Sequence, residues 1–178
     1  MINAKETMMI YRFKQLYNAL FTKIEPDEYQ WLSKILAPAE LVLFRKQALP
    51  EQRHALDVAY DIMSRQEEIV KTYNQEIFEN FLLAALLHDC GKALVKLQLW
   101  QRIIIVAFSC LPPGLWHKIA RQKNILGKTL LICQRHPAWG KRLTARAGVR
   151  EEVQILIQNH HSPTNSVEQL LYQADNRH

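Results

Sequence analysis

Apolar residues recur every three or four positions along most of this chain, which is the spacing of one face of an α-helix. The segment 74–88 differs because it is apolar on almost every side, so we expect it at the centre of the core. The sequence holds no hairpin dipeptide and no sustained alternation of apolar and polar residues, and we therefore expect an all-α domain. Helices are predicted in residues 3–21, 50–70, 74–88, 137–148, 149–161 and 166–178.

Proline and glycine mark several of the predicted helix ends. Pro26, Pro38 and Pro50 each precede an amphipathic run, as is usual for proline in the first turn of a helix. Gly148 separates two of the later helices, and Ser166 begins a Ser-x-x-Gln capping signal for the last one.

A chain of 178 residues is long enough to bury one core of its own. We expect residues 1–49 to form an N-terminal helical extension that packs on a single helical bundle formed by residues 50–178.

Residues 97–125 interrupt the bundle as a helical and apolar insertion. Its most hydrophobic run, residues 103–108, extends with its flanks to only about ten residues, whereas a membrane-spanning helix needs about 20. We therefore expect a buried helix or a short strand. Trp100, Trp116 and nearby basic residues also fit contact with an anionic membrane surface, and the insertion is in addition a candidate homodimer interface.

Charge is unevenly distributed along the chain, although its net value is only +6. From Cys90 to Arg150 there are twelve Lys or Arg residues and no Asp or Glu, whereas the rest of the chain holds 11 basic and 17 acidic residues. This asymmetry favours an anionic partner, such as a phosphorylated small molecule, nucleic acid or anionic lipid. A solvated basic surface without a ligand is the alternative.

The cysteines and the N-terminus indicate a cytoplasmic protein. Cys90, Cys110 and Cys133 lack metal-binding spacing and cannot all pair, which is typical of reduced thiols. The N-terminal residues carry charges too early and too often for a secretory signal. The protein would be peripheral to the membrane if its insertion binds lipid.

Five histidines and two aspartates lie near the ends or on the apolar-flanked faces of the predicted helices. A single histidine in such a place is more often a hydrogen-bonded core residue than a metal ligand. Seven groups are harder to bury without partners, because each unsatisfied polar group costs about 1–3 kcal/mol. Imidazole and carboxylate suit Fe, Mn, Zn or similar divalent ions, and paired ions in hydrolytic sites lie about 3.5–4 Å apart. The residues are His54, His88, Asp89, His136, His160, His161 and Asp175.

Short motifs around these residues resemble, in the same order, those of the HD-domain superfamily of metal-dependent phosphohydrolases. "RHALDVA" around His54 resembles the first-histidine helix of the family, and "LLHDCGK" resembles its LLHDxGK segment. "HPAWGKRL" from His136 resembles the HPxxG segment, and "LLYQADNR" with Asp175 resembles the closing AD helix. The resemblance extends from about Glu51 to the C-terminus. These segments occur together in HD-GYP phosphodiesterases and in bacterial HD hydrolases of diadenosine tetraphosphate.

The resemblance implies a helical HD domain whose ligands hold one or two divalent transition metal ions, such as Fe or Mn. Asp89 would bridge the two ions. One ion would be held by His54, His88, Asp89 and Asp175, and the other by Asp89, His136 and His160. His161 has a counterpart only in the HD-GYP group. Because adjacent residues of a helix point about 100° apart, both His160 and His161 can bind only if the helix frays there.

The activity implied by the resemblance is hydrolysis of a phosphomonoester, phosphodiester or nucleotide by a metal-activated water. Asp89 and Lys92 would be the catalytic residues. Lys92 matches the phosphate-contacting lysine of the family, and Gly91 permits a sharp helix end before it. The anionic, nucleotide-like substrate would be bound by Lys92, Arg135, Lys141 and Arg142. A solvated helix face is the alternative for the last three residues.

The sequence differs from the pattern of this family in two places. "SPTNS" follows His161 in place of the acidic, glycine-rich GYP sequence, which argues against cyclic-di-GMP as the substrate. The interval between Asp89 and His136 is longer than in compact members, and it coincides with the insertion. Two other functions of the fold stay open, a mixed-valent diiron oxygenase and a non-catalytic signalling module. The filled ligand positions favour an enzyme, and the lysine of "HDCGK" favours hydrolysis.

Overall fold

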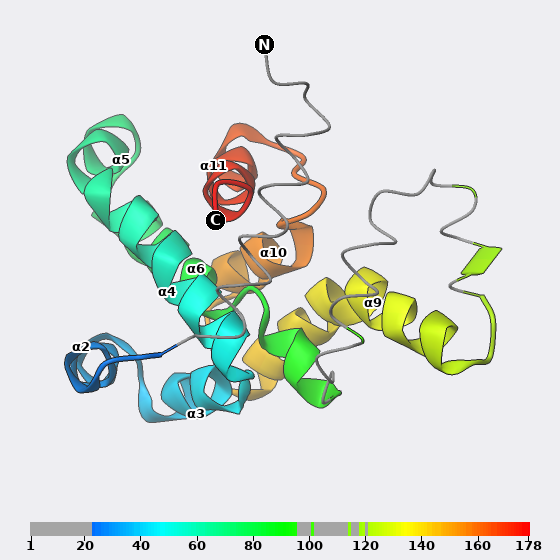
Figure 1. The fold of residues 1–178 in the computed structure, drawn as a ribbon. Helices are drawn as coiled ribbons and strands as arrows, with labels where there is room; N and C mark the ends of the chain where they lie inside the picture. Colours follow the sequence, from blue (N-terminus) through cyan, green and yellow to red (C-terminus); the bar gives the residue numbers. More distant parts are fainter. Residues whose placement is uncertain (1–22, 96–100, 102–113, 115–117, 120) are drawn as a thin grey trace, which may run out of the picture.

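The computed structural model describes residues 23–95, 101, 114, 118–119 and 121–178, and its architecture is helical (Figure 1). No strand occurs in these residues, which confirms the predicted all-α class. The N-terminal part contains α2 (Pro26–Ile35), α3 (Pro38–Lys46), α4 (Leu49–Ser64), α5 (Gln66–Thr72) and α6 (Gln75–Leu87). A short 3-10 helix, η1 (Cys90–Leu94), precedes α9 (Ile125–Arg146), α10 (Glu151–Asn159) and α11 (Ser166–Asp175).

Helix starts follow the local signals at most positions. Pro26 and Pro38 are the first residues of α2 and α3, and Pro50 is the second residue of α4, as predicted. Asn74 caps α6, since its side-chain oxygen accepts a hydrogen bond of 2.8 Å from the amide of Ile77. The prediction for α11 was off by one residue, because Asn165 rather than Ser166 provides the side-chain cap.

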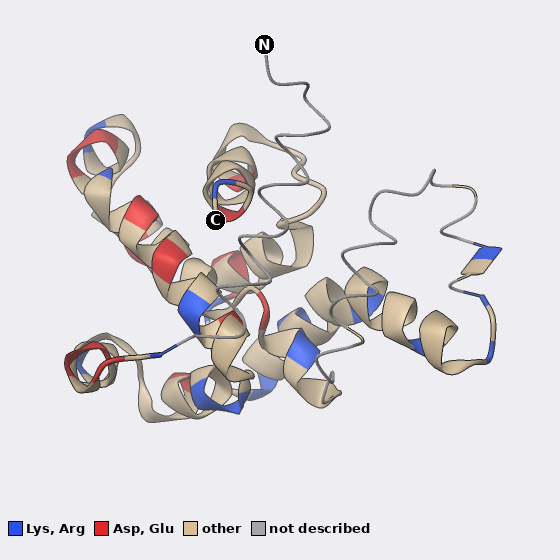
Figure 2. Cartoon of the chain, viewed as in Figure 1, with Lys and Arg blue, Asp and Glu red and all other residues tan. Residues whose placement is uncertain are grey.

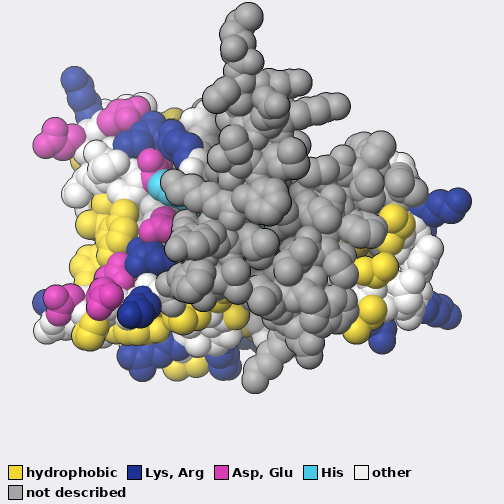
Figure 3. All heavy atoms as spheres, in the orientation of Figure 1, with side chains coloured by type: hydrophobic (Ala, Val, Ile, Leu, Met, Phe, Trp, Pro, Cys, Tyr) yellow, Lys and Arg dark blue, Asp and Glu magenta, His cyan; other side chains and the backbone are white. Residues whose placement is uncertain are grey.

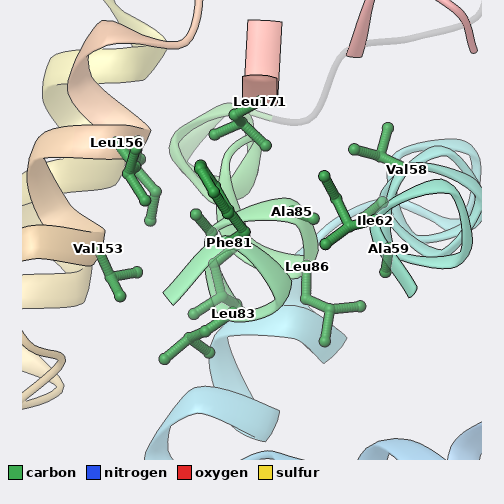
Figure 4. Close-up of a cluster of buried hydrophobic side chains, with 14 of the residues drawn as sticks. Val58, Ala59, Ile62, Phe81, Leu83, Ala85, Leu86, Val153, Leu156 and Leu171 are labelled. Carbon is green, nitrogen blue, oxygen red and sulfur yellow. The ribbon is translucent and has the colours of Figure 1, made fainter. Parts of the chain in front are cut away.

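Helix α6 lies at the centre of the core. It contacts α3, α4, α5, α10 and α11. Figure 4 shows Phe81 at the centre of the cluster, with Ile62 of α4 on one side and Leu156 of α10 on the other. Burying each such side chain contributes about 1.5–3 kcal/mol, so packing on all sides holds α6 in place.

Helices α2 and α3 belong to the same hydrophobic core. Leu32 of α2 and Phe44 of α3 are fully buried, and both are members of the cluster that surrounds α6. Arg53 of α4 also forms an ion pair of 2.7 Å with Glu28 of α2. The described part of residues 1–49 is thus packed against the segment that follows it.

Helix α9 begins well before the predicted start at residue 137. It runs from Ile125 to Arg146 and contains Pro137 in its interior. A proline there removes one backbone hydrogen bond, but Leu130 and His136 on the preceding turns are buried, and this burial holds the helix together. The predicted end is right, since Gly148 adopts a positive φ of 76° before α10 begins.

Several predictions lie outside the described residues. They include the helix at 3–21, the apolar run at 103–108, and Trp100 and Trp116 with the proposed membrane contact. Of the insertion, Gln101 is buried and donates a hydrogen bond of 2.9 Å to the hydroxyl of Thr129 on α9. No helix within the described ranges has both the length and the hydrophobicity needed to cross a membrane.

Charged residues are segregated in space as they are in sequence (Figure 2). Helices α2, α4 and α5 carry both acidic and basic residues, whereas the charged residues of α9 are all basic. The space-filling view shows acidic side chains gathered on the side of α2, α4 and α5 (Figure 3).

Candidate metal centre

The predicted ligands meet around the C-terminal end of α6. Their ligand atoms form three groups in which all atoms lie within 4.8 Å of one another. The groups are His54 with His88 and Asp89, His88 with His160 and Asp175, and His136 with His160 and His161. The seven residues come from five parts of the chain, on α4, α9 and α11 and directly after α6 and α10. The structure therefore brings together every ligand position predicted from the sequence.

Two of the histidines are held at a helix end by the same contact, between Nδ1 of the ring and the backbone carbonyl three residues earlier. A helix leaves its last carbonyls without intrahelical partners, and His88 and His160 are the C-cap residues of α6 and α10. Nδ1 of His88 lies 2.9 Å from the carbonyl of Ala85, and Nδ1 of His160 lies 2.7 Å from that of Ile157. Since a carbonyl only accepts, each Nδ1 carries the proton and donates it. Nε2 is then the nitrogen that faces the cluster and can bind a metal.

One half of the cluster joins α4, α6 and α11 through Asp175. Its Oδ1 accepts a hydrogen bond of 2.8 Å from Nε2 of His54 and lies 3.4 Å from Nε2 of His88. The rings of His54 and His88 contact each other edge to face, with centroids 5.2 Å apart. This half contains two imidazoles and one carboxylate around a common point.

The other half joins α9 and α10. Nε2 of His136 lies 3.3 Å from Nε2 of His160 and 3.2 Å from Oδ1 of Asp89. Asp89 also approaches the first half, because its Oδ2 is 3.6 Å from Nε2 of His88. Asp89 thus lies between the two halves, with one oxygen directed to each.

His161 lies next to His160 just beyond the end of α10. Helix α10 ends at Asn159, so both histidines lie beyond its last residue, and His160 as the C-cap keeps helical dihedral angles. Their ring centroids are 4.0 Å apart, and the ring of His136 is 5.0 Å from that of His161. The side chain of His161 is 49% exposed, whereas those of the other two are buried. His161 therefore forms the solvent border of the cluster.

Lys92 forms an ion pair with Asp89 of the cluster. Its ammonium lies 2.7 Å from Oδ2 of Asp89, and its side chain remains 26% exposed. The 3-10 helix η1 makes this contact by turning the chain directly after Asp89. Glu51 of α4, which is buried, adds a second carboxylate to the surroundings of Lys92. The pKa of Lys92 is raised, because these carboxylates outweigh the effect of burial.

The charged members of the cluster stabilise one another. Burial alone would lower the pKa of His88, but Asp89 and Asp175 raise it to about 9. Burial alone would raise the pKa of Asp89, but Lys92 and His88 hold it well below its usual range. The pKa of Asp175 is also well below its usual range, because the hydrogen bond from His54 and the positive charge of His88 outweigh its burial.

The other histidines are held in their neutral form. Burial lowers the pKa of His136, and burial together with the charge of His88 lowers that of His160 well below its usual range. Partial burial and the neighbouring His136 lower the pKa of His161 to about 4. Neutral imidazole is the form that binds metal ions, so these three side chains need no deprotonation at pH 7.

The unsatisfied polar atoms of the cluster fit a bound cation. Nε2 of His88 and Oδ1 of Asp89 are buried and lack a hydrogen bond of satisfactory geometry within the described chain. Two ligands about 2.0–2.1 Å from one tetrahedral ion lie about 3.3 Å apart, which matches the 3.3 Å between Nε2 of His136 and Nε2 of His160. The donors are imidazoles and carboxylates, which suit several divalent metal ions. The buried His and Asp groups could therefore hold a metal ion.

Two glycines allow the elements that carry these ligands to approach closely. A Cβ on Gly91 would overlap the carbonyl oxygen of His136 and lie 2.7 Å from the amide nitrogen of Gly140. A Cβ on Gly140 would lie 2.9 Å from a side-chain carbon of Ile157 on α10. Among the described glycines only Gly148 has a positive φ, so Gly91 is required for space rather than for a left-handed helix end.

The predicted substrate-binding residues occupy different surroundings. Lys92 contacts Asp89, as described above. Arg135 and Arg142 are exposed and Lys141 is half-buried on α9. Arg135 precedes the candidate ligand His136, so its side chain leaves the helix about 100° away from the His136 side chain, which faces the cluster.

Two buried polar residues that the sequence interpretation missed support the ligands from outside. Glu168 of α11 accepts hydrogen bonds from the side chain of Asn159, just before His160, and from both the amide and hydroxyl of Thr164. Gln47, before α4, donates a hydrogen bond of 3.0 Å to the carbonyl of Leu86. Their sequence surroundings gave no signal, because their partners are set by packing between helices.

Comparison with family models, curated proteins and solved structures finds no match to this chain.

Proposed function

We propose that this protein is a metal-dependent phosphohydrolase of the HD type, as the order of its motifs implies. The observation that carries the proposal is the position of Asp89. One oxygen of Asp89 approaches His88 and the other approaches His136. Lys92, whose side chain is partly exposed, binds the same carboxylate. A bridging carboxylate with a cation at its border is suited to a phosphorylated substrate.

The ligands divide between two positions that share Asp89. His54, His88 and Asp175 would complete the first position, and His136, His160 and His161 would complete the second. Iron or manganese is the metal proposed for them, because the donors are imidazole and carboxylate. A bound divalent ion would lower the pKa of a coordinated water toward 7 and so supply hydroxide for attack on phosphorus.

The chain itself supplies positioning and charge. Lys92 would bind a phosphoryl oxygen and offset the negative charge that develops during hydrolysis. The carbonyls of Ala85 and Ile157 fix the rings of His88 and His160, so that neither imidazole can turn away from the centre. Because His161 is half-exposed, the anionic and nucleotide-like substrate would enter beside it.

The test combines metal analysis with a substrate screen. The purified protein would be analysed for transition metals, loaded with Mn or Fe(II), and assayed for phosphate release from nucleotides, cyclic nucleotides and dinucleoside polyphosphates. We expect Asp89→Asn to lose bound metal and to lower turnover by more than about 100-fold. Asp27→Asn is the control, because Asp27 is an exposed carboxylate on α2.

Three results would contradict the proposal. If Asp89→Asn leaves metal content and turnover unchanged, Asp89 is neither a metal ligand nor a catalytic residue. Dioxygen consumption by the Fe-loaded protein without phosphate release would assign an oxygenase instead. A protein that retains no transition metal would favour a non-catalytic binding or signalling module.

A further inference from the structure

Helix α9 carries a straight line of basic side chains on its outer face. Lys128, Arg135 and Arg142 are seven residues apart, and Arg146 follows one turn later. Seven residues fall about 20° short of two full turns, so the four side chains lie within about 40° of one another around the helix. All four are exposed. We call these four residues the α9 stripe.

The charge of the α9 stripe is not neutralised by described residues. Within the described part of the chain none of its four side chains forms an ion pair, whereas Arg53, Arg65 and Arg177 each pair with a carboxylate. No Asp or Glu occurs on α9 itself, which appears in Figure 2 with blue positions and no red ones. Four positive charges therefore face solvent along one line.

The dimensions of the α9 stripe fit an extended anion. From Lys128 to Arg146 the helix rises about 27 Å, at about 1.5 Å for each residue. This length equals the rise of about eight base pairs, since one strand of duplex DNA carries a phosphate every 3.4 Å along the axis. A single mononucleotide is too short to reach all four side chains.

The same face argues against a lipid surface. A helix that lies in a membrane interface presents bulky apolar side chains beside its basic ones. On α9 the large hydrophobic residue that is exposed is Ile125, the first residue of the helix. Beside the α9 stripe, Ala138 and Ala145 are exposed, and Leu131 and Trp139 are partly buried. The occupant must therefore be a hydrophilic polyanion.

We infer that the α9 stripe binds the phosphodiester backbone of a nucleic acid, with each of its four cations beside a phosphate. Contacts of this kind position a nucleic acid without reading its bases, so binding should be independent of sequence. The inference goes beyond the proposed hydrolysis and does not require it, because Arg135 and the ligand His136 leave α9 about 100° apart.

The test measures fluorescence anisotropy of labelled oligonucleotides about 20 units long, as single-stranded RNA and as duplex DNA of mixed sequence, over a range of salt concentrations. For the duplex we expect log K to fall with log salt with a slope of about −3.6, at about −0.9 for each neutralised phosphate. The double variant Arg135→Glu/Arg142→Glu should weaken binding by more than about tenfold and reduce the slope by about 2.

The matched control is Lys34→Glu/Lys71→Glu, which changes the net charge equally at exposed positions on α2 and α5. It should bind like the wild type, and so should Asp89→Asn, which separates this inference from the metal centre. Absence of binding to both oligonucleotides near 50 mM salt overturns the inference, and so does equal weakening by the control. Binding to phosphatidylserine vesicles but to neither oligonucleotide would assign the α9 stripe to a membrane instead. Circular dichroism of each variant shows that it is folded.

Discussion

Glu168 connects two elements that carry candidate metal ligands, and its removal should loosen both. The residue is buried, with 3% of its surface exposed. Its carboxylate accepts three hydrogen bonds, of 2.8 Å from the side chain of Asn159, 2.6 Å from the amide of Thr164 and 2.9 Å from the hydroxyl of Thr164. It therefore joins α11, which ends at Asp175, to the end of α10 and to the segment after His161.

The loss can be worked out from these contacts. A hydrogen bond to a charged group contributes about 1.5–3 kcal/mol, and the three bonds share one acceptor group, so their contributions are not additive. We expect Glu168→Ala to lower the free energy of unfolding by about 3–5 kcal/mol. For a chain of this size each kcal/mol lowers Tm by about 2–4 °C, which gives a decrease of about 10 °C. Glu168→Gln keeps the shape but turns one acceptor into a donor, so its effect should be smaller.

The measurement is thermal unfolding by circular dichroism, together with Mn affinity. Because His160 and His161 lie next to the connection, metal affinity should fall about 10–100-fold. Glu152→Gln, at an exposed position of α10, is the control and should change neither quantity. A Tm of Glu168→Ala within about 1 °C of the wild type would refute the reasoning.

The pH dependence gives a second test of the same connection. Burial alone would raise the pKa of Glu168, but hydrogen bonds from Thr164 and Asn159 lower it below its usual range. The native state thus binds a proton more weakly than the unfolded state does. The stabilisation is present above the pKa of the unfolded chain and is lost as pH falls through the lower, folded pKa. The difference in stability between wild type and Glu168→Gln should therefore shrink below about pH 4.

Two further predictions concern the centre itself. Because the pKa of His88 is about 9 without metal, binding at pH 7.5 should displace about one proton, and titration calorimetry in buffers of different ionisation enthalpy should show it. Proton release on metal binding should vanish above about pH 10, where His88 is already deprotonated. If no proton is released at pH 7.5, His88 is not protonated in the metal-free protein. Gly91→Ala should destabilise the protein by about 3 kcal/mol, because its Cβ would meet backbone atoms of α9. Gly114→Ala, where a Cβ meets nothing within 4 Å, should leave urea unfolding unchanged.

Local signals predicted most helix starts, and tertiary packing explains the failure at α9. Pro26, Pro38 and Pro50 lie in first turns, as expected. The helix predicted at 137–148 also begins at a proline, and this start is wrong, because burial of the preceding turns holds α9 together through Pro137. Sequence spacing cannot show which turns are buried. It therefore could not separate a starting proline from an internal one.

The order of the motifs predicted which residues lie together in the cluster, but not which residues support them. His88 and His160 both follow apolar helices in the sequence, which identifies them as helix ends. The proton on each Nδ1 depends on a carbonyl three residues earlier, a contact that local geometry fixes only once the helix stops there. Gln47 reaches Leu86 across 39 residues of sequence, so only the packed fold reveals it as a support.

The metal-free cluster is balanced in charge, and this balance predicts how the protein responds to chelation. The buried carboxylates of Asp89 and Asp175 face two cations, protonated His88 and Lys92, whose pKa values are both raised. Removing a metal therefore leaves no unpaired buried charge, since a proton on His88 replaces part of the lost positive charge. We expect EDTA to lower Tm while the helical signal at 222 nm persists at 25 °C. Loss of that signal on chelation would show that the metal, rather than these ion pairs, holds the core together.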